Sequence, residues 1–226
     1  MKRWRSAVLE VGLIFIGITL ALVFENWNEE RVERVQEVEL LEQILQDLRT
    51  AHRELTNDDH PRLQAQQSAS EQLIEKLAGT ELLSAESVAR ELDVLLAYGS
   101  RFYPQTAGYR SLLSVGVDLI SNDQLRFELV LFYERGLPRI AEAEDDLWDS
   151  YDRFLHPYVF EQFQTAERQG ELITVPRDVD ALKSDPAFKL ILRRLAGSRG
   201  RLSTQYGRAE VQSEVLIQSL EEALAR

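Results

Sequence analysis

The most constraining feature of the sequence is an apolar run near its N-terminus. Between Ser6 and Phe24 the chain has nineteen residues and a single charge, Glu10. As a helix this stretch is about 28 Å long, close to the ~30 Å hydrocarbon core of a bilayer. The sequence therefore predicts a transmembrane helix over residues 6–24.

Two other interpretations of the run remain open: a buried helix of a soluble protein and a cleavable signal peptide. An unbroken apolar stretch such as residues 11–24 is unusual for a core helix at an N-terminus. A signal peptide needs a small-x-small cleavage site, which the end of the run at Phe24, Glu25 and Asn26 matches poorly. We therefore expect an uncleaved signal anchor.

The charges on either side of the run predict its orientation. Basic residues precede it and acidic residues follow it: Lys2, Arg3 and Arg5, then Glu25, Glu29 and Glu30. Positive charge stays on the cytoplasmic side of a membrane. We expect residues 1–5 in the cytoplasm of a bacterium, the span in its inner membrane, and residues 25–226 as a periplasmic helical domain.

Several residues at the ends of the run are candidate membrane or partner contacts. Trp4 and Trp27 stand at opposite ends, where indole rings settle at the headgroup level. Asn26 and Asn28 flank Trp27 and have polar groups for lipid headgroups or for the backbone of a partner. The alternative is that all three residues after the run form a plain interfacial anchor.

Three residues inside the run are candidates for contact with another transmembrane helix. Glu10 either reaches the nearby interface or is protonated, or it contacts another transmembrane helix. Gly17 and Ala21 form a small-xxx-small pair, which permits close approach of a second helix. The expected partners are the lipid bilayer and either other integral-membrane proteins or a second copy of the chain.

Helical periodicity continues beyond the run. Apolar or core-compatible residues recur at alternating steps of three and four: Val38, Leu41, Leu45, Leu48, His52 and Leu55. Leu40 and Ile44 widen this face beyond a two-stranded seam, which favours packing inside a bundle. The polar cluster at residues 56–61 predicts the end of this helix and the start of another.

The rest of the chain also has helical patterns. Further helices are expected near residues 61–78, 84–98, 106–115, 124–135, 138–163, 186–195 and 202–225. Residues 121–123 are expected to cap the helix at 124–135, and Gly136 to end it. Residues 171–176 are the one short β-like run, interpreted as an extended linker, and residues 197–200 are a possible helix break. The predicted fold is all-α: a single transmembrane helix continuous with an extramembrane antiparallel helical bundle.

Composition excludes some functions. The chain carries a net charge of −12, which disfavours binding to DNA or RNA, and it has no cysteine for disulfides, thiol catalysis or metal binding. The three histidines, His52, His60 and His156, have no second ligand at metal-site spacing. No nucleophile elbow, P-loop or dinucleotide turn is present. We expect no cofactor, no metal, no catalytic residues and no enzymatic activity.

Three clusters have both a functional and a structural interpretation. The acidic helix over residues 142–152 could hold a divalent cation or form a solvated face. The arginines between residues 193 and 208 could pair with that helix or dock an acidic partner. The aromatic segment at residues 98–109 could line a pocket or interface, or pack in the core.

Two stretches resemble a family of bacterial single-pass membrane proteins of unknown function. Residues 9–22 followed by the Glu-Asn-Trp-Asn-Glu-Glu-Arg sequence of residues 25–31 are similar to its N-terminal signature. Residues 106–116, with 119–122 and Leu125, are similar to its central helical segment. The resemblance covers the anchor well and the middle loosely. It implies the anchor and the helical domain, and no activity.

Two hypotheses for function follow. The first is a non-catalytic accessory or scaffold subunit that docks on a larger bacterial inner-membrane complex, for example a photosynthetic or respiratory one. The alternative is a periplasmic sensor or ligand-binding module that acts through partner transmembrane helices.

Overall fold

A computed structural model describes residues 2–80, 82–97, 101–168 and 170–225, with side chains from residue 15 onward within these ranges. The chain is mostly helical, which confirms the all-α prediction apart from one small β-hairpin. The elements are α1 (Lys2–Glu54), η1 (Leu55–Asp59), α2 (His60–Ala78), α3 (Ala85–Leu96), α4 (Ala107–Val115), η2 (Val117–Leu119), α5 (Asp123–Leu131), η3 (Phe132–Gly136), α6 (Leu137–Ser150), η4 (Tyr151–Leu155), α7 (His156–Gln162), β1 (Phe163–Arg168), β2 (Glu171–Pro176), α8 (Val179–Ser184) and α9 (Pro186–Leu224).

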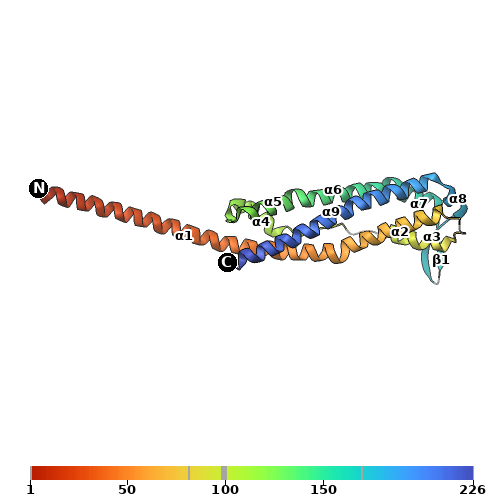
Figure 1. The fold of residues 1–226 in the computed structure, drawn as a ribbon, viewed down its shortest axis with the longest axis horizontal. Helices are drawn as coiled ribbons and strands as arrows, with labels where there is room; N and C mark the ends of the chain where they lie inside the picture. Colours follow the sequence, from red (N-terminus) through yellow and green to blue (C-terminus); the bar gives the residue numbers. More distant parts are fainter. Residues whose placement is uncertain (1, 81, 98–100, 169, 226) are drawn as a thin grey trace.

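Three long helical rods form the body of the molecule. The first consists of α1, η1 and α2, the second of α5 to α7 with their π turns, and the third of α9 (Figure 1). Helix α9 packs against the other two and runs antiparallel to both. The first and second rods run in the same direction, so the predicted antiparallel bundle holds for α9 alone among the three rods.

The helices continue past three prolines, each of which is preceded by a π turn. Proline has no N–H, and its ring clashes with the carbonyl four residues earlier, which normally ends or kinks a helix. Here Pro61, Pro138 and Pro157 each lie two residues after a π turn. In each case the residue before proline donates its N–H to the carbonyl five residues earlier. The predicted helix ends at residues 56–61 and at Gly136 were therefore wrong.

The core lies between the rods. The predicted positions Leu41, Leu45, Leu48 and Leu55 of the first rod are buried, and Val38, where α1 leaves the bundle, is exposed. Helix α9 contributes a long buried stripe: Phe188, Leu192, Leu195, Leu202, Tyr206, Leu216 and Leu220. The short helices cover the first rod, since α4 packs on α1 and α3 packs on α2. Tertiary packing of these faces is what stabilises helices of such mixed polarity.

A β-hairpin lies at the end of the bundle opposite the N-terminus (Figure 1). Strands β1 and β2 pair antiparallel, with Phe163 opposite Pro176 and Arg168 opposite Glu171. Strand β2 packs against α3, which supports a hairpin that is too small to be stable alone. The prediction of an extended linker at residues 171–176 was wrong because residues 164–168, which form most of its partner strand, had no predicted element.

Helix α9 runs without a break through Gly197 and Gly200. A glycine inside a helix costs about 1 kcal/mol relative to alanine. The neighbouring Leu195 and Leu202 are buried in the core, and their packing offsets that cost. The predicted helix break at residues 197–200 was therefore wrong.

The first part of α1 projects from the bundle as a single helix (Figure 1). Its 53 residues correspond to a length of about 80 Å, of which roughly a third to a half packs in the bundle. Among the residues that the structure describes, no helix is both long enough and apolar enough to cross a bilayer. Residues 6–14 of the predicted span have side chains outside the described set.

Candidate functional site

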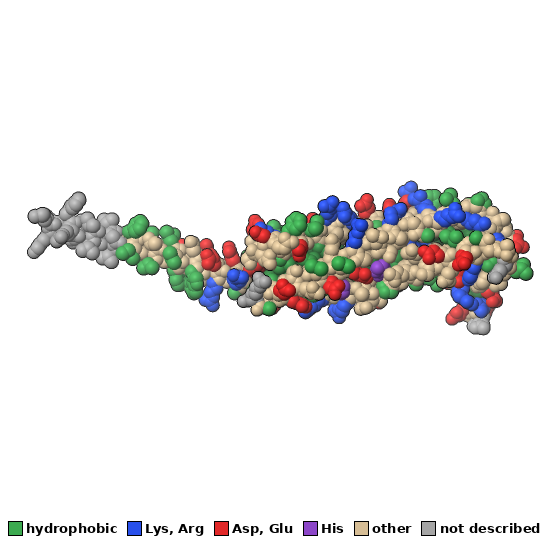
Figure 2. Space-filling model, viewed as in Figure 1, with side chains coloured by type: hydrophobic (Ala, Val, Ile, Leu, Met, Phe, Trp, Pro, Cys, Tyr) green, Lys and Arg blue, Asp and Glu red, His purple; other side chains and the backbone are tan. Residues whose placement is uncertain are grey.

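The projecting part of α1 is the first candidate site. Its described apolar side chains are more than half exposed: Phe15, Ile16, Ile18, Leu20, Leu22, Val23 and Phe24. Within the described residues no other element packs on them, and the burial of α1 begins at Glu37. Figure 2 shows these apolar side chains on the helix outside the bundle. A contiguous apolar surface of this kind is typical of a membrane or protein contact.

The predicted contact residues that can be described all lie on this exposed helix. Gly17 has no atom within 4 Å of the position that a Cβ would occupy, and Ala21 is exposed. Trp27 is half exposed and its ring lies 5.8 Å from the ring of Phe24.

Asn26 and Asn28 are also exposed. The side chains of Trp4 and Glu10 lie outside the described residues. The described contact residues thus lie along one helix and are exposed.

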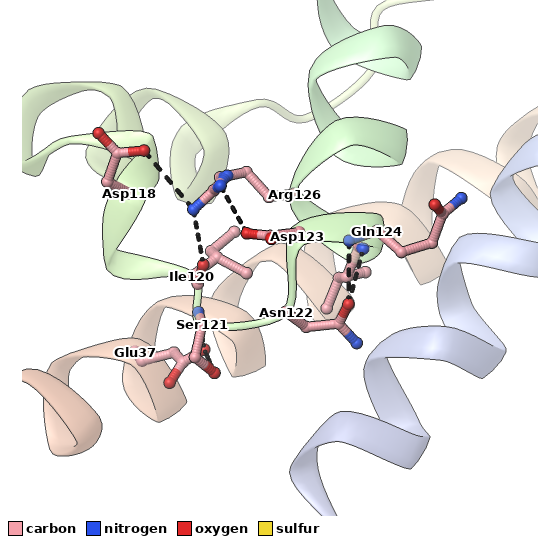
Figure 3. A network of polar contacts seen from close by, with 9 residues as sticks. Glu37, Asp118, Ile120, Ser121, Asn122, Asp123, Gln124 and Arg126 are labelled. Carbon is pink, nitrogen blue, oxygen red and sulfur yellow. Dashed lines mark hydrogen bonds and ion pairs between the residues drawn. The ribbon is translucent and has the colours of Figure 1, made fainter.

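A polar network fixes the point where α1 leaves the bundle (Figure 3). Glu37 is buried, and its Oε1 accepts hydrogen bonds from the backbone N–H of Ser121 at 2.7 Å and from its hydroxyl at 2.8 Å. Asn122 caps α5 by accepting from the N–H groups of Gln124 and Leu125. The predicted cap at residues 121–123 is confirmed, and it holds the start of α5 against α1.

Arg126 closes the same network from the second rod. It donates to the carbonyl of Ile120 at 3.2 Å and pairs with Asp123 at 2.6 Å and with Asp118 at 3.5 Å (Figure 3). Both carboxylates are exposed, so these pairs add little stability. Their effect is to define the conformation of the loop that receives Glu37.

A shallow cleft lies beside this network, between α1 and the loop. It has a volume of about 460 Å³. Trp27 lies at one end of its lining, and Asp118 and Ser121 lie on the loop side. Arg31 and Arg34 also line it. Trp27, which is predicted to lie at a membrane interface, therefore borders the junction between the projecting helix and the bundle.

Helix α4 packs closely on α1. The N–H of Gly108 donates to Oδ2 of Asp47 at 2.8 Å, and both groups are buried. A Cβ on Gly108 would lie only 2.8 Å from the backbone nitrogen of Ile44. Only glycine permits this approach, which places α4 firmly on the first rod.

A second candidate site is a small, mostly apolar cavity in the bundle that several polar side chains also line, with a volume of about 30 Å³, enough for one water molecule. Its polar lining includes Asp59, Gln66, Glu144, Tyr151 and Tyr206. Two of the π turns contribute to it, η1 through Asp59 and η4 through Tyr151. Such turns occur frequently at functional sites.

Glu144 is the central group of this cavity. Its Oε1 accepts from the N–H of Phe102 at 2.9 Å and from the hydroxyl of Tyr206 at 2.6 Å. Burial raises the pKa of Glu144, while these two hydrogen bonds and nearby Arg101 oppose the shift. Burial also raises the pKa of Tyr206, and the neighbouring Glu144 carboxylate raises it further.

A fully buried arginine lies next to the cavity. Arg199 donates to the hydroxyls of Ser70 and Tyr151, and its guanidinium lies 5.4 Å from the centre of the Tyr151 ring. In the described part of the chain no carboxylate pairs with it, and its Nε has no hydrogen-bond partner. Tyr151 in turn donates to the carbonyl of Leu95 at 2.8 Å. This series of hydrogen bonds links α9, α2, η4 and α3.

Each of the three histidines contacts a different polar side chain. His52 Nδ1 lies 2.8 Å from the hydroxyl of Ser213, and His60 Nδ1 lies 2.9 Å from a carboxylate oxygen of Glu210. His156 Nδ1 lies 3.2 Å from Asp152, one turn earlier. Among the residues described, no group of three histidine or acidic side chains could hold a metal ion.

The charged and aromatic clusters divide between surface and core. In the basic cluster, Arg201 pairs with Asp146 of the acidic helix at 3.5 Å, and Arg194 stacks on Phe154. The structure thus joins the two clusters by one ion pair, and Glu142 and Arg208 line the same surface depression. In the aromatic segment Tyr109 stacks on buried Tyr133, whereas Tyr103 is exposed.

Sequence reasoning missed the buried polar residues of these sites: Glu37, Asp47, Glu144 and Arg199. A signal was present for two of them. Glu37 lies four residues before Leu41 and Asp47 lies three after Ile44, on the apolar face of the first rod. A charge on such a face is buried only with a partner, and the sequence does not say where the partner lies.

Comparison of the chain with protein-family models, with curated proteins and with solved structures finds no match.

Proposed function

We propose that this chain is a non-catalytic, membrane-anchored accessory or scaffold subunit. In this proposal α1 inserts in a bacterial inner membrane over residues 6–24 and the helical bundle rests on the periplasmic part of a larger membrane complex. The observation that carries it is the exposed apolar surface of α1 from Phe15 to Phe24. Leaving such a surface in water costs about 25 cal/mol per Å² of apolar area, and a bilayer or a partner helix removes that cost.

The junction supports a positioning role for the anchor. Glu37 and Ser121 tie α1 to the second rod, and Gly108 and Asp47 tie it to α4. The helix is continuous from the projecting segment into the bundle. A bundle fixed in this way would be held at a set height and orientation above the membrane, as a scaffold requires.

Flotation of the full chain with vesicles of phosphatidylethanolamine and phosphatidylglycerol tests the anchor. We expect the wild type to float at high salt, because burial of apolar side chains does not depend on ionic strength. The Ile18→Asp, Leu22→Asp double variant should stay at the bottom of the gradient. The matched control is Leu190→Asp, which changes an equally exposed apolar side chain of the bundle. Equal loss in the control, or no flotation of the wild type, would contradict the anchor.

A second measurement tests the docking role. A photoreactive amino acid at position 27 is expected to crosslink a membrane protein in intact cells, because Trp27 is exposed beside the junction cleft. Isolation in mild detergent as a monodisperse monomer with no crosslinked partner would contradict an accessory subunit.

The interior cavity supports the alternative of a ligand-binding module. The polar side chains in its mostly apolar lining and its two π turns favour that function, whereas its volume of about 30 Å³ accommodates little more than a water molecule. A thermal-shift screen of the full chain distinguishes the two, because a ligand that binds the folded state raises the midpoint of unfolding.

A further inference from the structure

A groove runs along the seam between the second rod and α9. Three adjoining depressions form it, with volumes of about 200, 250 and 440 Å³. The first two share Leu131 and Gln212, and the last two share Arg139 and Arg208. Within the described chain α3 and α4 cover the first rod, and no helix covers this seam.

The first depression of the groove is apolar. It is lined by Leu131 and Phe132 of the second rod and by Val211 and Val215 of α9. Val211 is 62% exposed and Val215 is 47% exposed, so their side chains can still lose contact with water. Burial of such side chains is favourable in proportion to the apolar area that it removes from water, before the costs of association.

The middle of the groove is basic. Arg135 and Arg139 lie one turn apart on the second rod, and Arg208 faces them from α9. All three side chains are exposed, and in the described chain none of them pairs with a carboxylate. Gly136 adds no side chain to the depression between them. Figure 2 shows basic side chains gathered over this part of the α6 and α9 pair, beside apolar ones.

The net charge of the chain makes this cluster unusual. The chain carries 38 acidic and 26 basic residues, yet three arginines line the middle depression, which has no acidic residue in its lining. Acidic residues line the two outer depressions: Glu128 the first, and Glu142 and Asp146 the last, where Asp146 pairs with Arg201. Guanidinium groups in a groove bind carboxylates with both charge and geometric selectivity. The groove therefore combines an apolar anchor site with a site for acidic side chains.

The height of the groove selects a protein partner over lipid. Glu37 lies thirteen residues beyond Phe24, or about 20 Å along α1, and it contacts the start of the second rod at Ser121. Arg135 lies a further ~18 Å along that rod. Lipid headgroups at the end of the apolar run would then lie on the order of 40 Å from Arg135. This distance is several times the Debye length of ~8 Å, beyond which salt screens the interaction between charges.

We propose that this groove docks an acidic amphipathic helix of a partner protein. The groove spans residues 201–215 of α9, which corresponds to a helix of about 14 residues or ~21 Å. Apolar side chains of the partner helix fill the site at Val211 and Val215, and its carboxylates contact Arg135, Arg139 and Arg208. This mode is helix-in-groove recognition with charge complementarity. It deepens the proposed function, on which it rests, by naming the surface that meets the complex.

Fluorescence anisotropy tests the groove with the full chain in detergent. The probe is a labelled helical peptide of about 14 residues, with leucines on one face near one end and glutamates on the same face near the other. We expect binding that weakens as salt rises, and a loss of about tenfold or more in Arg139→Glu and in Arg208→Glu. Arg90→Glu on α3 is the matched control, since it makes the same charge change at an exposed arginine away from the groove.

Charge reversal makes the test specific. A peptide with lysine in place of glutamate should not bind the wild type and should bind the Arg139→Glu, Arg208→Glu variant. Absence of binding by the acidic peptide, equal binding to the variants, or displacement by inorganic phosphate or anionic vesicles would overturn the proposal. Because the chain is in detergent, failure here is distinct from failure of membrane insertion in the flotation experiment.

Discussion

The carboxylate of Glu37 accepts two hydrogen bonds from Ser121, one from the backbone N–H and one from the hydroxyl (Figure 3). These residues are 84 positions apart in the chain and meet where α1 leaves the bundle. Each hydrogen bond to a charged acceptor contributes about 1.5–3 kcal/mol when its geometry is good. The pair therefore contributes to the attachment of the projecting helix to the bundle.

Removing the carboxylate of Glu37 should loosen this junction. We expect Glu37→Ala to lower the free energy of unfolding by about 1–3 kcal/mol, because the N–H of Ser121 loses its partner. Amide hydrogen exchange at residues 117–122 should accelerate. The control Glu33→Ala removes an exposed carboxylate one turn earlier on the same helix. If both variants unfold alike, the junction does not depend on Glu37.

A methyl group at Gly108 should separate α4 from α1. Gly108→Ala places a Cβ within 2.8 Å of the backbone of Ile44, so we expect a loss of about 1–3 kcal/mol in the free energy of unfolding. Gly197→Ala is the matched control, because its Cβ meets nothing within 4 Å in α9. That variant should gain about 0.5–1 kcal/mol. Urea denaturation measures both, and a stable Gly108→Ala would argue against this close contact.

The buried carboxyl of Glu144 should make stability depend on pH. Its folded-state pKa is raised by burial, so the folded chain binds the proton more tightly than the unfolded chain. Its contribution is fully present below the ordinary carboxyl pKa near 4.5 and is lost as pH rises through the folded-state pKa.

Glu144→Gln removes this titration and retains an oxygen acceptor. We expect the variant to gain stability relative to wild type as pH rises above 4.5, measured by urea denaturation at several pH values. Glu142→Gln removes an exposed carboxylate from the same helix and is the control. A stability difference between Glu144→Gln and wild type that stays constant with pH would contradict this role.

The stability of the fold should fall more when Arg199 loses its whole side chain than when it loses only its charge. Arg199→Ala leaves a cavity and removes the group that donates to the hydroxyls of Ser70 and Tyr151, so we expect a loss of about 3–5 kcal/mol. Arg199→Met keeps most of the volume and removes a buried cation, so its loss should be smaller. Thermal unfolding followed by circular dichroism compares the two. Equal losses would show that the guanidinium itself provides the stability.

The sequence by itself determined the helical class, the buried face of the first rod at Leu41, Leu45 and Leu48, and the cap before α5. These features depend on local spacing, which a sequence displays directly. Prolines and glycines led to wrongly predicted helix ends, because those predictions also rest on local sequence alone. Local rules end a helix at Pro61 or Gly200, whereas packing along the bundle carries it through a π turn or across an exposed glycine.

Only the tertiary structure decided which distant residues meet. Glu37 with Ser121, Asp47 with Gly108, Glu144 with Tyr206, and the arginines of the groove come from different elements. Their pairing depends on the return path through α3 and α4, which makes the first and second rods run in the same direction. A one-dimensional pattern can indicate that a charge lies on a buried face, and only the packed chain supplies the group that compensates it.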